Sequence, residues 1–198
     1  MRTVDQTRSR AGPDRVDEAL ALLAEVPTVL TFTRTVGDEF QGLLDDPVSV
    51  LDAILVLVRD SSWHVGLGFG PVDRPLPAAD PRRARGEAFL AARDAVEHAK
   101  NDPLHLAVVA PDRAAPEATD VKAVLDLLAA LQTRRTASGW EVSDLAAQGL
   151  TQAETAERLE ISRQAVQQRL RVSGWALEEA ARPTLVRLLD RAERAAGR

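Results

Sequence analysis

Side chains that can read nucleic acid gather in one short stretch of this chain, residues 162–171. Its arginines and glutamines recur at helical spacing, so they would share one side of a helix, opposite Val166 and Leu170. Arginine can bond a guanine edge with two N–H groups, glutamine can bond adenine in the same way, and both hold phosphates. The stretch therefore predicts a helix that enters the major groove of double-stranded DNA through Ser162, Arg163, Gln164, Gln167, Gln168 and Arg171.

The residues before this stretch carry the signals of a second helix and a tight turn. Thr151 with Glu154 three positions later is a capping box, which fixes a helix start, and Ser162 is a favourable N-cap for the next helix. The small Ala156 lets the two helices approach closely. Residues 150–170 thus predict a helix-turn-helix. The alternative is a helical hairpin that only packs, with its arginines and glutamines in solvent.

A second chemical feature is the acidic turn Gly37-Asp38-Glu39, which joins two expected strands. Asp5 ends the expected first strand, which should lie beside this hairpin. Carboxylates on neighbouring strands bind Mg²⁺ through their oxygens, and the metal can in turn hold a triphosphate. The predicted metal site is Asp5, Asp38 and Glu39; the alternative is a polar turn with a solvated Asp5.

Arginines cluster at two further places. Arg82, Arg83 and Arg85 precede an expected helix start, where backbone N–H groups and the helix dipole favour anions, so they are candidates for phosphate binding. The alternative is an ordinary solvated loop. Arg134 and Arg135 lie just before the helical C-terminal part and are expected to add phosphate contacts on the DNA side.

Hydrophobic periodicity predicts the elements that position these residues, in the order β-α-β-β-α-β and then α-β-α. The first six elements have the order of ferredoxin-like folds, with the first strand beside the hairpin in one sheet. Pro111–Pro116 reads as a loop, and Pro183 is expected to start a final helix. The expected strands lie at residues 3–5, 29–36, 40–43, 63–69 and 104–109, and the helices at 13–23, 47–59, 87–100 and 121–135.

The fold class predicted from this order is α+β: a ferredoxin-like or palm (nucleotidyl cyclase-like) domain followed by an all-α helix-turn-helix domain. We place the first domain at residues 1–110, a linker and connecting helix at 111–138, and the DNA-binding domain at 139–198. Trp140 and Trp175 bracket the helix-turn-helix and are expected to seal its small core.

Composition excludes several classes of function. Cysteine is absent, which excludes disulfides, thiolate metal sites and cysteine nucleophiles. The formal net charge is −5, so any attraction to nucleic acid must come from a local surface. No apolar run approaches the roughly 20 residues of a membrane span, and residues 1–5 show no secretory signal. We therefore expect a cytoplasmic protein without a membrane partner.

Four segments resemble one known family, the SatD family. They are Asp5 with Ser9-Arg10, the Gly37–Gly42 hairpin, the Gly66–Gly70 strand and the Gly86–Arg93 helix. The hairpin also looks like the acidic turn of class III and diguanylate cyclases. Residues 150–170 resemble the helix-turn-helix of bacterial regulators and of sigma-factor region 4, in which glycine usually stands where this chain has Glu160. A side chain there costs about 1 kcal/mol if the backbone is left-handed.

The resemblance implies a DNA-binding transcriptional regulator whose N-terminal domain is a degenerate cyclase, used for sensing or assembly. Class III cyclases carry a ribose-orienting Asn and a transition-state Arg on the helix after the glycine-rich strand. Here Leu90 stands at the Asn position and Arg93 is one residue out of register, so no catalytic residue is assigned. The alternative is a nucleotide-binding enzyme that uses Asp5 and Asp38 with Mg²⁺. A nucleotide ligand and a homodimer, which would suit two DNA half-sites, also stand as expectations.

Overall fold

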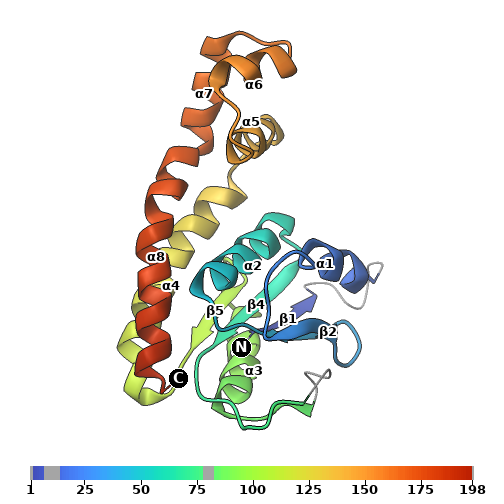
Figure 1. Ribbon diagram of the computed structural model, residues 1–198, viewed down its shortest axis with the longest axis vertical. Helices are drawn as coiled ribbons and strands as arrows, with labels where there is room; N and C mark the ends of the chain where they lie inside the picture. Colours follow the sequence, from blue (N-terminus) through green and yellow to red (C-terminus); the bar gives the residue numbers. More distant parts are fainter. Residues whose placement is uncertain (1, 7–13, 78–82, 198) are drawn as a thin grey trace.

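The computed structural model describes residues 2–6, 14–77 and 83–197. Of residues 2–6 it describes the backbone alone. Figure 1 shows a sheet with its helices at one end of an elongated molecule and a small group of helices at the other. This arrangement confirms the predicted α+β class. Every strand and helix expected up to residue 135 is present, with bounds that differ by a few residues.

One mixed sheet forms the base of the molecule. Its strand order is β2-β3-β1-β4-β5, with β1 antiparallel to both neighbours and β4 parallel to β5. The first strand therefore lies beside the hairpin, as predicted. The strands are β1 (Arg2–Gln6), β2 (Leu30–Arg34), β3 (Phe40–Leu43), β4 (Trp63–Gly68) and β5 (Leu106–Val109).

The main core lies on the sheet face covered by α1 (Val16–Leu22) and α2 (Pro47–Asp60). The α2 helix starts where Asp46 accepts a hydrogen bond from the Ser49 N–H, with Pro47 at the first turn. Alternate β4 residues point into this core, including Trp63, Val65 and Leu67. The alternation explains why the sequence pattern identified the strand.

The opposite sheet face is covered by α3 (Glu87–Ala99), which packs unusually close to β4. A Cβ added at Gly68 would lie 2.2 Å from the Ala92 backbone nitrogen, and one at Gly66 would lie 2.6 Å from that of Val96. The helix turns small side chains to the sheet, Ala88, Ala92, Ala95 and Ala99. The glycine-rich strand therefore serves the close approach of α3.

Two long helices run side by side along the molecule (Figure 1): α4 (Ala115–Thr133), preceded by the short turn η2 (Asp112–Ala114), and α8 (Trp175–Ala195). Leu125 of α4 and Leu185 of α8 lie in the same core as the sheet residues. The last helix thus packs on the sheet unit, although its first turn directly follows residue 174 at the other end of the molecule.

Two predictions about prolines were wrong. The segment up to Pro116 is not a loop, because α4 begins at Ala115 and the proline occupies its first turn, where a missing N–H costs nothing. Pro183 does not start a helix but lies inside α8. An interior proline costs about 3 kcal/mol, and burial of Leu185 and Leu189 just after it offsets that cost.

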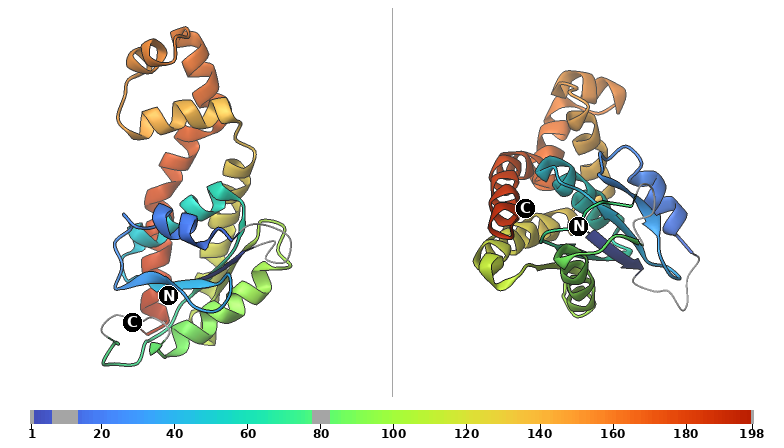
Figure 2. Two further views of the ribbon diagram at one scale, coloured as in Figure 1. Left: turned by 90° about the vertical axis from the view of Figure 1, so that its right-hand side faces the viewer. Right: turned by 60° about the horizontal axis from the view of Figure 1, so that its bottom comes forward.

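The remaining helices are α5 (Ala137–Ala147), α6 (Gln152–Arg158) and α7 (Arg163–Ser173), and they lie together at the far end from the sheet (Figure 2). The predicted domain boundary at 139 falls inside α5. In the part of the chain that the structure describes, no helix combines the length and the apolar character needed to cross a membrane.

Candidate nucleic-acid interface

Three helices, α5, α6 and α7, surround a small core of their own. Val142, Ala156 and Val166 are buried in it, and Leu159, Ile161 and Leu170 pack around them. The core is small because each helix contributes one or two apolar positions. It holds α6 and α7 at the close distance that Ala156 permits.

The capping box predicted for α6 is present. The Thr151 N–H donates to Glu154 Oε2 at 2.8 Å, and the Glu154 N–H donates to Thr151 Oγ1 at 3.3 Å. The hydrogen bonds from the Thr151 hydroxyl and N–H lower the pKa of Glu154. Ser162 caps α7 as predicted, accepting from the Ala165 N–H at 3.1 Å.

The turn between α6 and α7 uses a left-handed residue. Glu160 has a φ of +53°, and the Ile161 N–H donates back to the Ala156 carbonyl at 3.0 Å. This is the helix ending that usually places glycine at the left-handed position. The strain that a side chain brings there, about 1 kcal/mol, is therefore present in this protein.

All the polar residues predicted to face DNA are exposed, on α7 or at its N-cap Ser162, while Val166 of α7 is fully buried. Within this set, the Arg171 guanidinium donates to Gln168 Oε1 through Nε at 3.2 Å and Nη2 at 3.0 Å. A neighbouring arginine, Arg169, turns toward α5 instead and lies 3.4 Å from Glu141. The exposed set is Ser162, Arg163, Gln164, Gln167, Gln168 and Arg171.

The expectation that Arg135 contacts phosphate was wrong. Its side chain is fully buried, and its Nη2 lies 2.6 Å from Glu178 Oε2. Its Nε donates to the carbonyl of Ser173, the last residue of α7, at 3.0 Å, and Gln132 Nε2 donates to the other Glu178 oxygen at 3.0 Å. Arg135 thus ties α4 to α7 and α8, while Arg134 is exposed.

Trp140 is half-buried rather than sealed in a core. Its ring lies between two guanidinium groups, with Arg59 Cζ 4.1 Å and Arg135 Cζ 4.3 Å from its centroid. Arg59 comes from α2 and also pairs with Asp144 of α5 at 2.6 Å. Together with the half-buried Trp175, these groups line a hollow of about 460 Å³ between α2 of the sheet unit and α5. Sequence reasoning missed this junction, because its partners lie far apart in the chain.

The acidic hairpin is formed as predicted, with the Thr35 N–H donating to the Glu39 carbonyl at 2.8 Å across the turn. Asp5 pairs in register with His64 of β4, and its side chain lies outside the described part of the structure. Asp38 Oδ2 is buried, and among the residues that the structure describes it has no hydrogen-bond partner. Among the side chains that the structure describes, no three His, Asp or Glu residues gather closely enough to hold a metal ion.

A cavity of about 280 Å³ lies beside this hairpin, between β3 and α3. Glu39, Gln41 and Arg93 line it. Arg93, which stands one residue out of register with the transition-state arginine of class III cyclases, therefore faces the same cavity as Glu39, one of the predicted metal ligands. Leu90, at the expected Asn position, is 62% exposed.

The arginine loop before α3 is only partly described. Arg83 and Arg85 are exposed, and Arg82 lies outside the described residues. The first turn of α3 already has partners from the chain itself: the Ala88 N–H donates to the Pro71 carbonyl, and Glu87 pairs with Arg113 at 2.7 Å. The Ala88 N–H, a donor that a phosphate at this helix start would use, is therefore occupied, and the Glu87 carboxylate brings negative charge to the same turn.

Comparison with protein-family models gives a match to the SatD family over residues 23–189, which is most of the chain. The match begins just after α1, so it leaves out β1 and α1, and it extends through α5, α6 and α7 into α8. No curated protein and no solved structure matches the chain.

Proposed function

This chain belongs to the SatD family, and we propose that it is a transcriptional regulator that reads double-stranded DNA with α7. The observation that carries the proposal is the two-sided character of that helix. Val166 is buried against α5 and α6, and the arginines and glutamines of the opposite side are exposed. Such a helix, held on two others after a tight turn, is the arrangement that helix-turn-helix proteins insert into the major groove.

The dimensions of α7 suit this role. Its eleven residues span about 16 Å, and the major groove is about 12 Å wide. Arg163 and Gln164 stand in the first turn, where recognition helices contact base edges. The Arg171–Gln168 pair stands two turns further on and would hold the phosphate backbone. We therefore assign base reading to the first half of α7 and positioning to the second.

The test begins with selection of DNA sequences by the full-length protein from a random library. Binding of the selected site is then measured for the wild type, for Arg163→Ala and for the control Arg187→Ala. Arg187 is an exposed arginine on α8, so the control removes the same charge away from α7. Loss of a bidentate arginine contact costs about 1–3 kcal/mol, which weakens binding roughly 5- to 150-fold.

The control variant should bind within about twofold of the wild type, and wild-type affinity should fall steeply with salt. Failure to select any motif would refute the proposal. Equal affinities of Arg163→Ala and Arg187→Ala would refute the role of α7.

We propose that the sheet unit is a degenerate cyclase-like domain of the ferredoxin-like or palm type. Its β-α-β-β-α-β order and central β1 support this assignment. Its role would be sensing or assembly. Such a domain would lack the transition-state donors on which catalysis depends, given Leu90 at the Asn position.

One observation favours a second candidate, Mg²⁺ and nucleotide binding at Asp5 and Asp38. A buried carboxylate oxygen without a partner is costly, and Asp38 Oδ2 has none among the residues that the structure describes. A bound cation would satisfy it.

Thermal unfolding of the wild type and Asp38→Asn with each nucleoside triphosphate, with and without Mg²⁺, tests this. A ligand at about a hundred times its Kd stabilises by roughly 2.7 kcal/mol. A Mg²⁺-dependent rise in Tm that Asp38→Asn abolishes would support the site. The same Tm under all conditions would refute it.

A further inference from the structure

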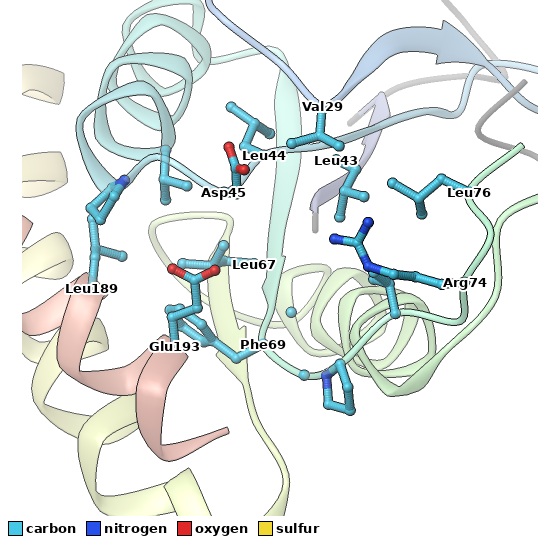
Figure 3. Close-up of a pocket in the computed structure, with 16 residues that line it drawn as sticks. Val29, Leu43, Leu44, Asp45, Leu67, Phe69, Arg74, Leu76, Leu189 and Glu193 are labelled. Carbon is cyan, nitrogen blue, oxygen red and sulfur yellow. The ribbon is translucent and has the colours of Figure 1, made fainter. Parts of the chain in front are cut away.

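A separate pocket of about 270 Å³ opens between the end of β3, the loop after β4 and the C-terminal half of α8 (Figure 3). Most of the residues that line it are apolar, with Leu43, Leu67 and Phe69 among them. These three residues belong to the buried cores of the sheet unit, so the pocket is built on rigid elements.

Three charged side chains stand around the apolar surface. Asp45 follows β3, Arg74 lies on the loop after β4, and Glu193 lies on α8. Figure 3 shows the two carboxylates and the guanidinium on different sides of the pocket, with Arg74 reaching toward Leu43. Within the described structure, neither Asp45 nor Arg74 makes a hydrogen bond or an ion pair, so both are available to a ligand.

This combination restricts the chemistry of the occupant. A simple carboxylic acid could pair with Arg74 but would meet two carboxylates, and a simple amine would leave the guanidinium unused. A molecule with a carboxylate, an ammonium group and an apolar body uses all three. The volume is below the roughly 300–1,000 Å³ of drug-sized pockets, which favours a small ligand.

We propose that this pocket binds an apolar α-amino acid. Arg74 receives its carboxylate through two N–H groups, Asp45 and Glu193 hold its ammonium group, and its side chain lies against Leu67 and Phe69. The proposal stands on the pocket alone, so failure of DNA binding would leave it intact. It adds a ligand that the DNA-binding role does not require.

The experiment is calorimetric titration of the full-length protein with leucine, methionine and phenylalanine at millimolar concentration. Two fragments of leucine, 4-methylpentanoate and 3-methylbutylamine, test whether both charges are needed. The variants are Arg74→Gln and Asp45→Asn, with Arg187→Gln as a matched control outside the pocket.

At least one amino acid should bind, and each pocket variant should weaken it by roughly tenfold or more, because each loses a charge-assisted hydrogen bond. The control should bind as the wild type does. Absence of binding by all three amino acids would overturn the proposal. So would fragments that bind as tightly as leucine, or pocket variants that bind like the control.

Discussion

Replacing Arg135 by methionine removes one half of a buried ion pair and should strongly destabilise the protein. The Arg135 side chain has no solvent exposure, and the Glu178 side chain is 6% exposed. The two are 2.6 Å apart, and Gln132 supplies one more hydrogen bond to the carboxylate. Methionine fills a similar volume, so the main loss is electrostatic rather than a cavity.

The expected magnitude follows from what is left behind. Glu178 would remain buried with Gln132 as its hydrogen-bond donor, and breaking a buried pair in this way costs about 3–5 kcal/mol. The Ser173 carbonyl also loses its donor, Arg135 Nε. For a chain of about 200 residues each kcal/mol corresponds to about 2–4 °C, so Tm should fall by about 6–20 °C.

Urea and thermal unfolding of the single variants and of the double variant Arg135→Met/Glu178→Leu would measure the effect. The double variant has no unpaired charge, so it should recover much of the lost stability, and the cycle should show strong coupling. If Arg135→Met lowered the free energy of unfolding by less than about 1 kcal/mol, the result would contradict a buried pair, because exposed salt bridges contribute that little. A double variant as unstable as the sum of the two singles would refute the coupling.

Three further predictions concern the turn, the sheet and a helix cap. Glu160→Gly should raise stability to urea by about 1 kcal/mol because it relieves a left-handed φ, and no gain would contradict the strain. Gly68→Ala should lower it by about 1–3 kcal/mol, since the new Cβ would collide with the Ala92 backbone; an unchanged midpoint would refute the tight packing. Hydrogen bonds from the Ser49 hydroxyl and N–H lower the pKa of Asp46, so wild type should exceed Asp46→Asn in stability above the unfolded pKa of about 3.9. That advantage should vanish as pH falls through the lower folded pKa; urea unfolding from pH 7 to 3 checks this, and a pH-independent difference would contradict it.

The parts of the fold that could be predicted are those fixed by local pattern. Strand β4 alternates core-facing Trp63, Val65 and Leu67 with residues that face α3, and this period of two is visible in the sequence. The start of α6 was predictable from Thr151 and Glu154 because a capping box joins residues three positions apart.

The parts that could not be predicted depend on contacts between distant residues. A charged residue such as Arg135 is expected in solvent, and only Glu178, far along the chain, makes its burial tolerable. Pro183 signals a helix start locally, but the burial of Leu185 on the sheet unit extends the helix on both sides of it. Arg74 and Glu193 likewise share a pocket only after the chain has folded.

The position of α7 relative to the sheet unit depends on contacts of unequal strength. Arg59 and Asp144 bridge the two parts, but their side chains are 43% and 40% exposed, so this pair contributes at most about 1 kcal/mol. The buried contacts are made by α4 and α8, where Arg135 holds the Ser173 carbonyl and a Cβ on Gly174 would collide with Leu131. The end of α7 is therefore fixed on α4. Since α8 continues from that point to the pocket that contains Glu193, the helix that we propose to read DNA and the proposed ligand pocket are joined by one continuous helix.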